Sequence, residues 1–182
     1  MLVLLDRDGV INEDDPIGVL RFEQFKFLPR SIEGIVKLTK AGFNIVVCTN
    51  QAAIGRGLTT HTIVNQVHEY MRAEVAKAGG KIDEVYYASA ADDLPSIWRK
   101  PAPGMLLEGM KNYNADPLRT PFVGDMLRDM QAAVAAGCPR ILTRTGKGTK
   151  LEAEGIPDAI APVQVVDDLY AAADYIIATY RA

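Results

Sequence analysis

Two hydrophobic periodicities alternate along the chain. Short, unbroken apolar runs are typical of strands buried on both faces of a sheet, and they are expected at residues 2–5, 43–48, 82–87, 122–123, 141–143 and 163–166. Between them, apolar residues recur every three or four positions, as in amphipathic helices, at residues 31–41, 60–78, 104–113, 128–136 and 168–180. Ser31 is expected to cap the first helix, and the second is expected to begin at Thr60. This alternation predicts an α/β fold with a mainly parallel sheet and right-handed crossovers.

Two segments depart from the alternation. The connection at residues 9–29 is too long for a plain turn between a strand and a helix, and it contains Pro16, Gly18 and an aromatic-rich stretch. We expect a short hairpin or flap there. Residues 144–162 are rich in Gly, Pro and Lys and are expected to be the least structured part of the chain.

The composition is that of a soluble, single-domain protein. The 182 residues suit one domain with one core, and 48% of them are hydrophobic and 24% charged. The formal charge of −3 argues against a nucleic-acid-binding surface, which needs an excess of basic residues. No apolar run has membrane-spanning length, and residues 1–5 do not have the form of a secretory signal. Cys48 and Cys138 border apolar segments and are expected to be buried free thiols of a cytoplasmic protein.

Carboxylates follow the first predicted strand directly. Asp6 and Asp8 stand one residue apart, and Gly9 allows the chain to turn sharply behind them. Functional loops in α/β sheets lie at the carboxyl ends of strands, so both aspartates are expected in a site. Adjacent carboxylates repel each other, and a divalent cation is the usual group that offsets this repulsion. An N-capping pair is the alternative, but Val10 and Ile11 are a poor helix opening.

Polar groups also follow the second predicted strand. Thr49, Asn50 and Gln51 bring a hydroxyl, two amides and loop N–H groups to its carboxyl end. Such a set can bind an anion such as phosphate. A polar turn with an Asn cap is the simpler interpretation of the same residues.

The third and fourth strands lead to a lysine and to two further aspartates. Two prolines restrict the backbone after Lys100, which favours a fixed ammonium over an ordinary solvated lysine. Asp125 ends the fourth strand, and Asp129 reaches the same place if a helix begins between them. Carboxylates for a cation, a hydroxyl for phosphate oxygens and an ammonium for negative charge are therefore expected at one edge of the sheet.

These motifs, in this order, resemble those of the haloacid dehalogenase superfamily of phosphohydrolases. The superfamily pattern is Asp-x-Asp-Gly, then Thr or Ser, then Lys, then Gly-Asp-x-x-x-Asp, and the chain matches it at residues 6–9, 49, 100 and 124–129. The longer stretches Asp-Arg-Asp-Gly-Val-Ile-Asn, Thr-Asn-Gln-Ala-Ala-Ile-Gly-Arg-Gly and Arg-Lys-Pro-Ala-Pro-Gly-Met resemble the branch of heptose bisphosphate and histidinol-phosphate phosphatases. The resemblance extends from about residue 2 to Lys147.

The resemblance implies a three-layer, doubly wound, Rossmann-like core in a single domain, residues 1–182. Only about forty residues separate the first two motifs, which leaves no room for a large cap domain. The site is therefore expected to be open. The flap at about 9–29 and a loop at about 88–99 would form its rim and select the substrate.

The resemblance also implies catalytic roles. Asp6 would attack phosphorus and form an aspartyl-phosphate. Asp8 would act as general acid and then general base, with a pKa raised by neighbouring carboxylates. Mg²⁺ would be held by Asp6, Asp125 and the backbone carbonyl of Asp8.

The remaining assignments concern the phosphate and the rest of the substrate. By the same resemblance, Thr49 and Lys100 would bind the phosphoryl oxygens, and Asp129 would orient Lys100 or a metal-bound water. Substrate contacts are expected from Asp14, Asn50, Gln51 and Arg99. An arginine such as Arg99 can grip a second phosphate through two hydrogen bonds, and Trp98 can either cover a sugar face or anchor the loop on the sheet.

The chain departs from this branch in its metal-binding residues. Members of the branch usually carry three cysteines and a histidine in a zinc loop before Arg-Lys-Pro, whereas residues 88–98 contain neither residue type. Zinc is therefore not expected, and Mg²⁺ is the expected cofactor. His61 and His68 lack a nearby third ligand and are interpreted as surface or cap residues. Met126 stands where heptose phosphatases tend to have a lysine.

The expected partner is a small phosphorylated metabolite, with D-glycero-D-manno-heptose 1,7-bisphosphate as the leading substrate, bound by a monomer without nucleic-acid or membrane partners. Histidinol phosphate is an alternative.

A polynucleotide 3′-phosphatase shares the Thr-Asn-Gln stretch, but the acidic balance and the lack of a basic, aromatic groove argue against it. A phospho-accepting receiver module combines similar residues without Asp-x-Asp-Gly. The presence of every catalytic residue type argues against an inactive scaffold.

Overall fold

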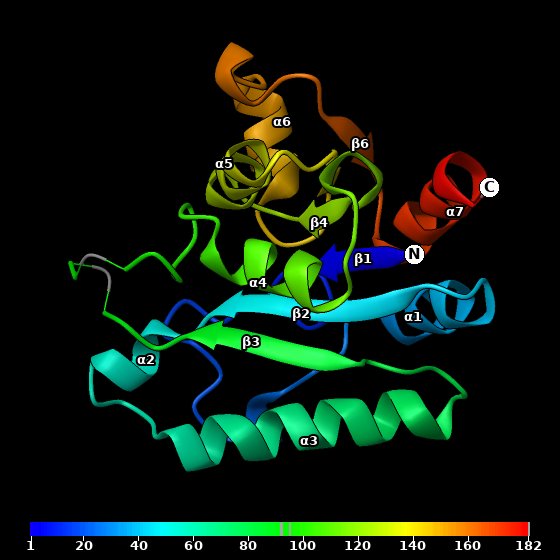
Figure 1. Cartoon of the computed structure of the whole chain (residues 1–182). Helices are drawn as coiled ribbons and strands as arrows, with labels where there is room; N and C mark the ends of the chain where they lie inside the picture. The colour runs from blue at the N-terminus through cyan, green and yellow to red at the C-terminus, as the bar shows by residue number, and fades with distance from the viewer. Residues whose placement is uncertain (92, 95, 182) are drawn as a thin grey trace.

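Six parallel strands form the centre of the computed structural model, which describes residues 1–91, 93, 94 and 96–181. The strands are β1 (Leu2–Leu5), β2 (Asn44–Asn50), β3 (Glu84–Ala88), β4 (Phe122–Gly124), β5 (Arg140–Thr143) and β6 (Gln164–Val166). They lie in the order β3-β2-β1-β4-β5-β6, and neighbouring strands are parallel (Figure 1). The expected doubly wound, parallel α/β sheet is confirmed.

Helices cover both faces of the sheet. The α-helices are α1 (Ser31–Lys40), α2 (Ala52–Gly55), α3 (His61–Lys77), α4 (Gly104–Asn112), α5 (Leu127–Ala136), α6 (Gly148–Glu154) and α7 (Leu169–Tyr180). Three single turns of 3-10 helix are η1 (Phe22–Gln24), η2 (Pro117–Arg119) and η3 (Asp158–Ile160). Side chains of α1, α3 and α7 form one core cluster with the sheet, and those of α4 and α5 form another. The molecule therefore has the three layers that the resemblance implied.

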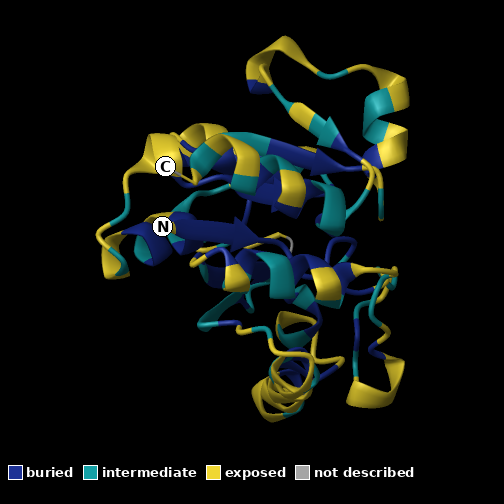
Figure 2. Ribbon diagram, turned by 90° about the vertical axis from the view of Figure 1, so that its right-hand side faces the viewer, coloured by how far each residue is buried: buried dark blue, intermediate teal, exposed yellow. Residues whose placement is uncertain are grey.

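Each face of the sheet contributes strand side chains to one of the two core clusters. Val3 and Leu5 belong to the cluster with α1, α3 and α7, whereas Leu2 and Leu4 belong to the cluster with α4 and α5. Successive strand side chains point to opposite faces, so an unbroken apolar run is required here. Figure 2 shows the strands as a buried centre with exposed residues on the outer helices and loops. Cys48 and Cys138 are free and buried, as expected.

The strand order decides where a site can form. From β1 the chain winds to one side through β2 and β3, and to the other side through β4, β5 and β6 (Figure 1). The connections that leave β1 and β4 therefore diverge, and the carboxyl ends of these strands lie at the point where the winding reverses. Ligands of open α/β sheets bind at such a point.

One segment is more ordered than its sequence predicted. Residues 144–162 contain α6 and η3, so the expectation of the least structured part was wrong. Leu151 of α6 packs against the buried side chains of Met130, Leu142 and Ile160. This helix depends on tertiary contacts rather than on an apolar periodicity of its own. The short helix α2 was also not predicted.

The two expected helix starts lie one residue from their predicted positions. The second helix was expected to begin at Thr60, but α3 begins at His61, and Thr60 is its cap, where its side chain accepts a hydrogen bond from the Ile63 N–H. Ser31, however, is the first residue of α1, and Arg30 occupies the cap position with a left-handed φ of 62°. The chain enters this helix from a left-handed turn, which shifts the boundary by one residue and makes the Ser31 prediction wrong.

The connection at residues 9–29 folds back on itself. The Glu13 N–H donates to the Lys26 carbonyl at 2.8 Å, and the Leu28 N–H donates to the Ile11 carbonyl at 2.9 Å. The segment is thus a hairpin-like return whose ends stay close to β1. No helix among the described residues is both long and apolar enough to span a membrane.

Candidate active site

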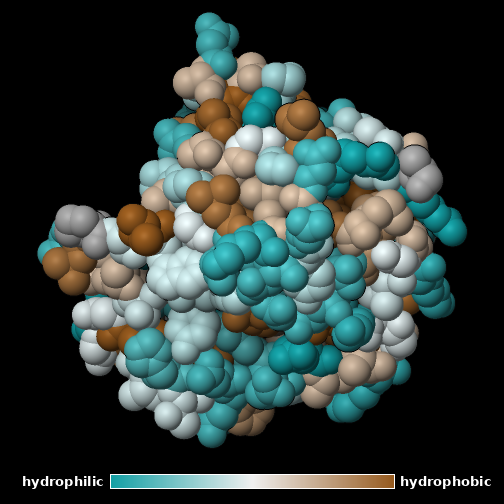
Figure 3. All heavy atoms as spheres, viewed as in Figure 1, coloured by the Kyte–Doolittle hydropathy of each residue, from teal (hydrophilic) through white to brown (hydrophobic). Residues whose placement is uncertain are grey.

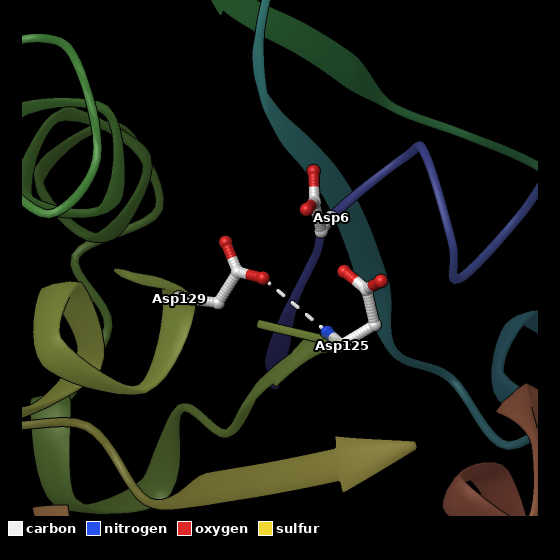
Figure 4. Close-up of side chains that lie close together, drawn as sticks. All are labelled: Asp6, Asp125 and Asp129. Carbon is white, nitrogen blue, oxygen red and sulfur yellow. Dashed lines mark hydrogen bonds between the residues drawn. The ribbon is translucent and has the colours of Figure 1, made fainter. Parts of the chain in front are cut away.

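Three aspartates meet at the carboxyl ends of β1 and β4. Asp6 follows β1, Asp125 follows β4, and Asp129 lies on the first turn of α5. One carboxylate oxygen of each residue lies within 4.8 Å of the others, and all three side chains are buried (Figure 4). The strand ends predicted to carry a site therefore do bring their carboxylates together.

Lys100 completes this charged cluster. Its Nζ lies 2.8 Å from Asp6 Oδ1 and 2.8 Å from Asp129 Oδ1, and its side chain is 1% exposed. Burial by itself lowers the pKa of Lys100, but the Asp129 and Asp6 carboxylates raise it above its ordinary value, so the ammonium stays charged. The Asn50 amide fixes the Lys100 backbone by donating to its carbonyl at 2.9 Å and accepting from its N–H at 3.0 Å. Asn50, expected to contact substrate, thus holds the lysine.

Asp129 uses both of its oxygens within the protein. While Oδ1 faces Lys100, Oδ2 accepts hydrogen bonds from the backbone N–H groups of Asp125 and Met126 at 3.3 and 3.0 Å. Figure 4 shows the bond to Asp125 as a dashed line. These contacts place the Asp129 carboxylate between Lys100 and the backbone that follows β4.

The cluster has the electrostatics of a cation site. Burial and the carboxylate of Asp129 raise the pKa of both Asp6 and Asp125, because three negative charges share one ammonium. Asp125 Oδ2 accepts from the Lys147 N–H at 2.8 Å, whereas Oδ1 is buried without a hydrogen-bond donor among the described residues. An oxygen left in this state suits a divalent cation.

The composition of the cluster favours a hard metal ion. Among the described residues, it is the one group of three or more His, Cys, Asp or Glu side chains close enough to hold a metal, and it contains neither Cys nor His. Carboxylate oxygens are the ligands of Mg²⁺ rather than of structural zinc. The residues present therefore fit Mg²⁺.

Two glycines allow loops to close on Asp125. Gly9 and Gly146 have φ values of 83° and 57°, and a Cβ at either position would lie 2.2 or 2.1 Å from Asp125 Oδ2. A side chain at either residue would displace the carboxylate and strain the backbone. Glycine at these two positions is therefore a requirement of the site.

Asp8 has a separate set of partners. Its oxygens accept hydrogen bonds from Arg7 Nη2 at 2.7 and 3.0 Å and from Asn12 Nδ2 at 2.9 Å. Gln51 Nε2 lies 2.9 Å from Asp8 Oδ2, and the Thr49 hydroxyl lies 3.4 Å from the same oxygen. Burial alone would raise the pKa of Asp8, but the Arg7 guanidinium and these hydrogen bonds hold it below its usual range. The expectation of a raised pKa was wrong, because the residue between the two aspartates supplies the offsetting charge.

The sequence analysis missed Arg7 and misinterpreted His68. Arg7 is fully buried, and its Nη1 lies 3.1 Å from Nε2 of His68. His68 is buried on α3, so the interpretation as a surface or cap residue was wrong, whereas His61 is exposed at the start of that helix. A signal was present: His68 falls on the apolar stripe of α3 with Val64 and Val67.

A cleft of about 130 Å³ opens beside Asp8, between the flap and the residues that follow β2 and β3. The four expected substrate contacts all line it, namely Asp14, Asn50, Gln51 and Arg99. Flap residues 14–18 form one wall. The basic side chains on its lining are Arg56, Arg99, Arg128 and Lys147. The cleft thus joins the catalytic edge of the sheet to a basic rim.

The loop at residues 88–99 projects beyond β3. Asp92 and Pro95 of this loop lie outside the described residues. Leu94 and Ile97 are exposed, and Figure 3 shows hydrophobic side chains gathered at the protruding tip. Trp98 stacks on Tyr86 with ring centroids 5.9 Å apart. Trp98 does not belong to the cleft lining described above, which favours its interpretation as a loop anchor.

Comparison with known proteins agrees with this geometry. A family model described as "HAD-hyrolase-like" matches residues 97–172. Over 177 residues, covering 97% of each chain, the sequence is 37% identical to D-glycero-beta-D-manno-heptose-1,7-bisphosphate 7-phosphatase of Bordetella bronchiseptica. The chain belongs to the haloacid dehalogenase superfamily. It is a phosphatase, as the motifs implied.

Further relatives support this membership. The chain is 36% identical over 176 residues to the 7-phosphatase of Pseudomonas putida, covering 97% of this chain and 99% of that one. The crystal structure of the B. bronchiseptica D,D-heptose 1,7-bisphosphate phosphatase, complexed with magnesium and phosphate, matches with a TM-score of 0.91, 37% identity and coverage of 97% and 98%. The corresponding enzyme of Burkholderia thailandensis matches with a TM-score of 0.73, 38% identity and coverage of 96% and 97%.

Proposed function

We propose that this phosphatase is Mg²⁺-dependent, acts through an aspartyl-phosphate, and removes the 7-phosphate of D-glycero-D-manno-heptose 1,7-bisphosphate. The observation that carries the proposal is the buried cluster of Asp6, Lys100, Asp125 and Asp129 beside a cleft with a basic rim. Relatives named for this reaction supply the substrate.

In the first step, Asp6 is the nucleophile. Its Oδ1 accepts a hydrogen bond from the Arg7 N–H at 2.7 Å and forms an ion pair with Lys100 Nζ at 2.8 Å, so we assign the attack to Oδ2. A bond forms between this oxygen and phosphorus while the ester P–O bond breaks. Asp8 must bind a proton before this step, although Arg7 holds its pKa low in the free enzyme, and it then gives that proton to the departing alkoxide.

In the second step, the aspartyl-phosphate is hydrolysed. Asp8 takes a proton from water as the water oxygen bonds to phosphorus, and the bond between phosphorus and Asp6 breaks. Inorganic phosphate leaves and the Asp6 carboxylate is regenerated. Thr49 and Lys100 stabilise the negative charge of the phosphoryl oxygens in both steps.

The metal is proposed to bind at the aspartate cluster. Asp6, Asp125 and the backbone carbonyl of Asp8 would hold Mg²⁺, which supplies positive charge against the repulsion between carboxylates and phosphate. Asp129 is left to orient Lys100, since both of its oxygens are engaged. Zinc has no part in this proposal.

The basic rim supports a substrate with two phosphates. Arg56, Arg99, Arg128 and Lys147 line a cleft that also includes Asp8, so a second anionic group can bind there while the first reaches the aspartates. A monophosphate has no second anion to contact this rim.

A substrate panel with metal control tests the proposal. The purified chain is treated with EDTA, supplied with Mg²⁺ or Zn²⁺, and assayed for phosphate release from heptose 1,7-bisphosphate, histidinol phosphate, other sugar phosphates and a 3′-phosphorylated oligonucleotide. We expect Mg²⁺ alone to restore activity, the heptose bisphosphate to give the highest kcat/KM, and metal analysis to find no stoichiometric zinc. A higher kcat/KM for histidinol phosphate or the oligonucleotide would overturn the substrate, and one bound zinc per chain would overturn the metal assignment.

A further inference from the structure

A fully buried arginine connects the Asp8 carboxylate to α3. The Arg7 guanidinium reaches Asp8 Oδ1 through Nε at 3.3 Å and through Nη2 at 2.7 Å, and reaches Oδ2 through Nη2 at 3.0 Å. Its other edge, at Nη1, lies 3.1 Å from Nε2 of His68. The Phe25 ring of the flap lies 5.9 Å from the guanidinium carbon. One planar group therefore holds Asp8 on one side and is itself held by His68 on the other.

The direction of the contact with His68 follows from elementary chemistry. A guanidinium has only donors and stays protonated in proteins, so Nη1 donates and Nε2 of His68 accepts. The accepting ring must be neutral and must carry its proton on Nδ1. Burial and the adjacent Arg7 charge lower the pKa of His68 to about 3, which agrees with a neutral ring.

The position of His68 calls for such a bond. His68 lies on the buried face of α3 together with Val64, Val67 and Met71, where a polar ring without a hydrogen bond loses its hydration without compensation. The Arg7 guanidinium would likewise keep a buried N–H without an acceptor if His68 were apolar. The two groups satisfy each other across 61 residues of sequence.

We propose that His68 is a positioning residue which, through Arg7, keeps the Asp8 carboxylate oriented for proton transfer. The proposal rests on the function proposed above, in which Asp8 serves both steps. Proton transfer depends steeply on position, and a shift of about 1 Å in a reacting group can cost about a hundredfold in rate. Without an acceptor at residue 68, the guanidinium turns toward other partners and the carboxylate turns with it.

The two reaction steps respond differently to a displaced Asp8. With para-nitrophenyl phosphate, the departing phenolate needs little help from a proton donor, so formation of the aspartyl-phosphate continues. Hydrolysis of that intermediate still needs Asp8 to take the proton from water. A displaced Asp8 therefore makes the phosphoenzyme accumulate, which a general loss of folded protein does not do.

The experiment compares three variants of the full chain in Mg²⁺. His68→Leu removes the acceptor, and His68→Gln keeps an acceptor oxygen near the place of Nε2. Gln66→Leu, at an exposed position of the same helix, is the matched control, because the His61 ring contacts Tyr87, which packs on His68. Each is assayed with ³²P-labelled para-nitrophenyl phosphate for kcat, KM and the fraction of enzyme trapped as phosphoenzyme after acid quenching. We expect His68→Leu to lower kcat about tenfold without raising KM and to increase the trapped fraction. His68→Gln should recover most of kcat, and Gln66→Leu should resemble the wild type.

A double-variant cycle keeps the test decisive if His68→Leu folds poorly. Arg7→Lys keeps a positive charge for Asp8 but lacks the Nη1 donor, so it should also accumulate phosphoenzyme, and adding His68→Gln to it should change kcat no further. Unchanged kcat in His68→Leu, equal losses in the Leu and Gln variants, or a fall in kcat without accumulation would overturn the role of His68. A wild-type chain that forms no phosphoenzyme would instead overturn the proposed function.

Discussion

Two Lys–Asp ion pairs of nearly equal length lie in opposite surroundings. Lys100 contacts Asp129 at 2.8 Å in the aspartate cluster, and both side chains are at most 1% exposed. Lys147 contacts Asp14 at 2.9 Å on the rim of the cleft, where the side chains are 52% and 25% exposed. The first pair is surrounded by protein atoms and fixed by further contacts, whereas water competes for the second.

The difference in burial matches different tasks for the aspartate cluster and the rim of the cleft. A buried ion pair is strongly destabilised when one partner is removed, because the other charge stays without compensation. An exposed pair contributes little and can exchange its partner for a ligand. The aspartate cluster therefore suits a phosphoryl-transfer site that must stay preorganised, and the rim suits charges that rearrange around different substrates.

Replacing the nucleophile should give the largest effect. Asp6→Asn keeps the shape of the side chain but cannot attack phosphorus, so we expect turnover to fall by about 10⁴-fold or more. Circular dichroism and thermal unfolding should show an intact fold, since the amide oxygen can still accept from the Arg7 N–H and Lys100 keeps Asp129 as its partner. Turnover close to that of the wild type would refute the assignment of the nucleophile.

The two ion pairs should differ in what they contribute to stability. Asp129→Ala keeps Asp6 as a partner of the buried Lys100 ammonium but leaves the N–H groups of Asp125 and Met126 without their acceptor, so it should lower the free energy of unfolding by about 1–3 kcal/mol. Asp14→Ala removes the partner of Lys147 on the rim and should lower it by about 1 kcal/mol or less. Urea denaturation of both variants in one buffer measures the contrast. Similar losses would show that burial does not distinguish the pairs.

A rim arginine should matter for one class of substrate. Arg99→Ala should lower kcat/KM for the bisphosphate roughly ten- to a hundredfold. This corresponds to a loss of about 1.5–3 kcal/mol in transition-state stabilisation, the usual contribution of a charge-assisted hydrogen bond. Para-nitrophenyl phosphate has no second anion and should be much less affected. Arg119→Ala, an exposed arginine just before β4, is the control. Equal losses on both substrates would assign Arg99 to the reacting phosphate.

The pH dependence of stability should separate the two histidines of α3. The pKa of His68 is about 3 in the folded chain, below its ordinary 6.5, so the stability from its neutral form is complete above pH 6.5. Between pH 6.5 and 3 the unfolded chain binds a proton that the folded chain does not. The free energy of unfolding should then fall by about 1.36 kcal/mol per pH unit through this group.

Urea denaturation at several pH values tests this contribution. His68→Gln should remove that part of the slope, while His61→Gln, at an exposed position, should keep it. Identical slopes in the wild type and in His68→Gln would show that the buried ring does not resist protonation.

The strands, the longer helices and the aspartate cluster could be predicted because their signals are local. An apolar run needs only its own residues to indicate a buried strand, and residues at the carboxyl ends of parallel strands must lie at one edge of the sheet. Asp6, Lys100, Asp125 and Asp129 therefore converge as the motifs implied. The order of the motifs was specific enough to identify the superfamily.

The sequence by itself therefore determined the fold class, the superfamily and the residue types of the catalytic edge. The tertiary structure alone decided that Arg7 is buried against Asp8 and that Nε2 of His68 accepts a hydrogen bond from Nη1 of Arg7. It also decided that α6 forms by packing on apolar side chains that are distant in the sequence. These features depend on which side chains, far apart in the sequence, pack together and shield one another from water. Desolvation fixes the charge and hydrogen bonds of a buried side chain, and it is a property of the assembled packing rather than of neighbours along the chain.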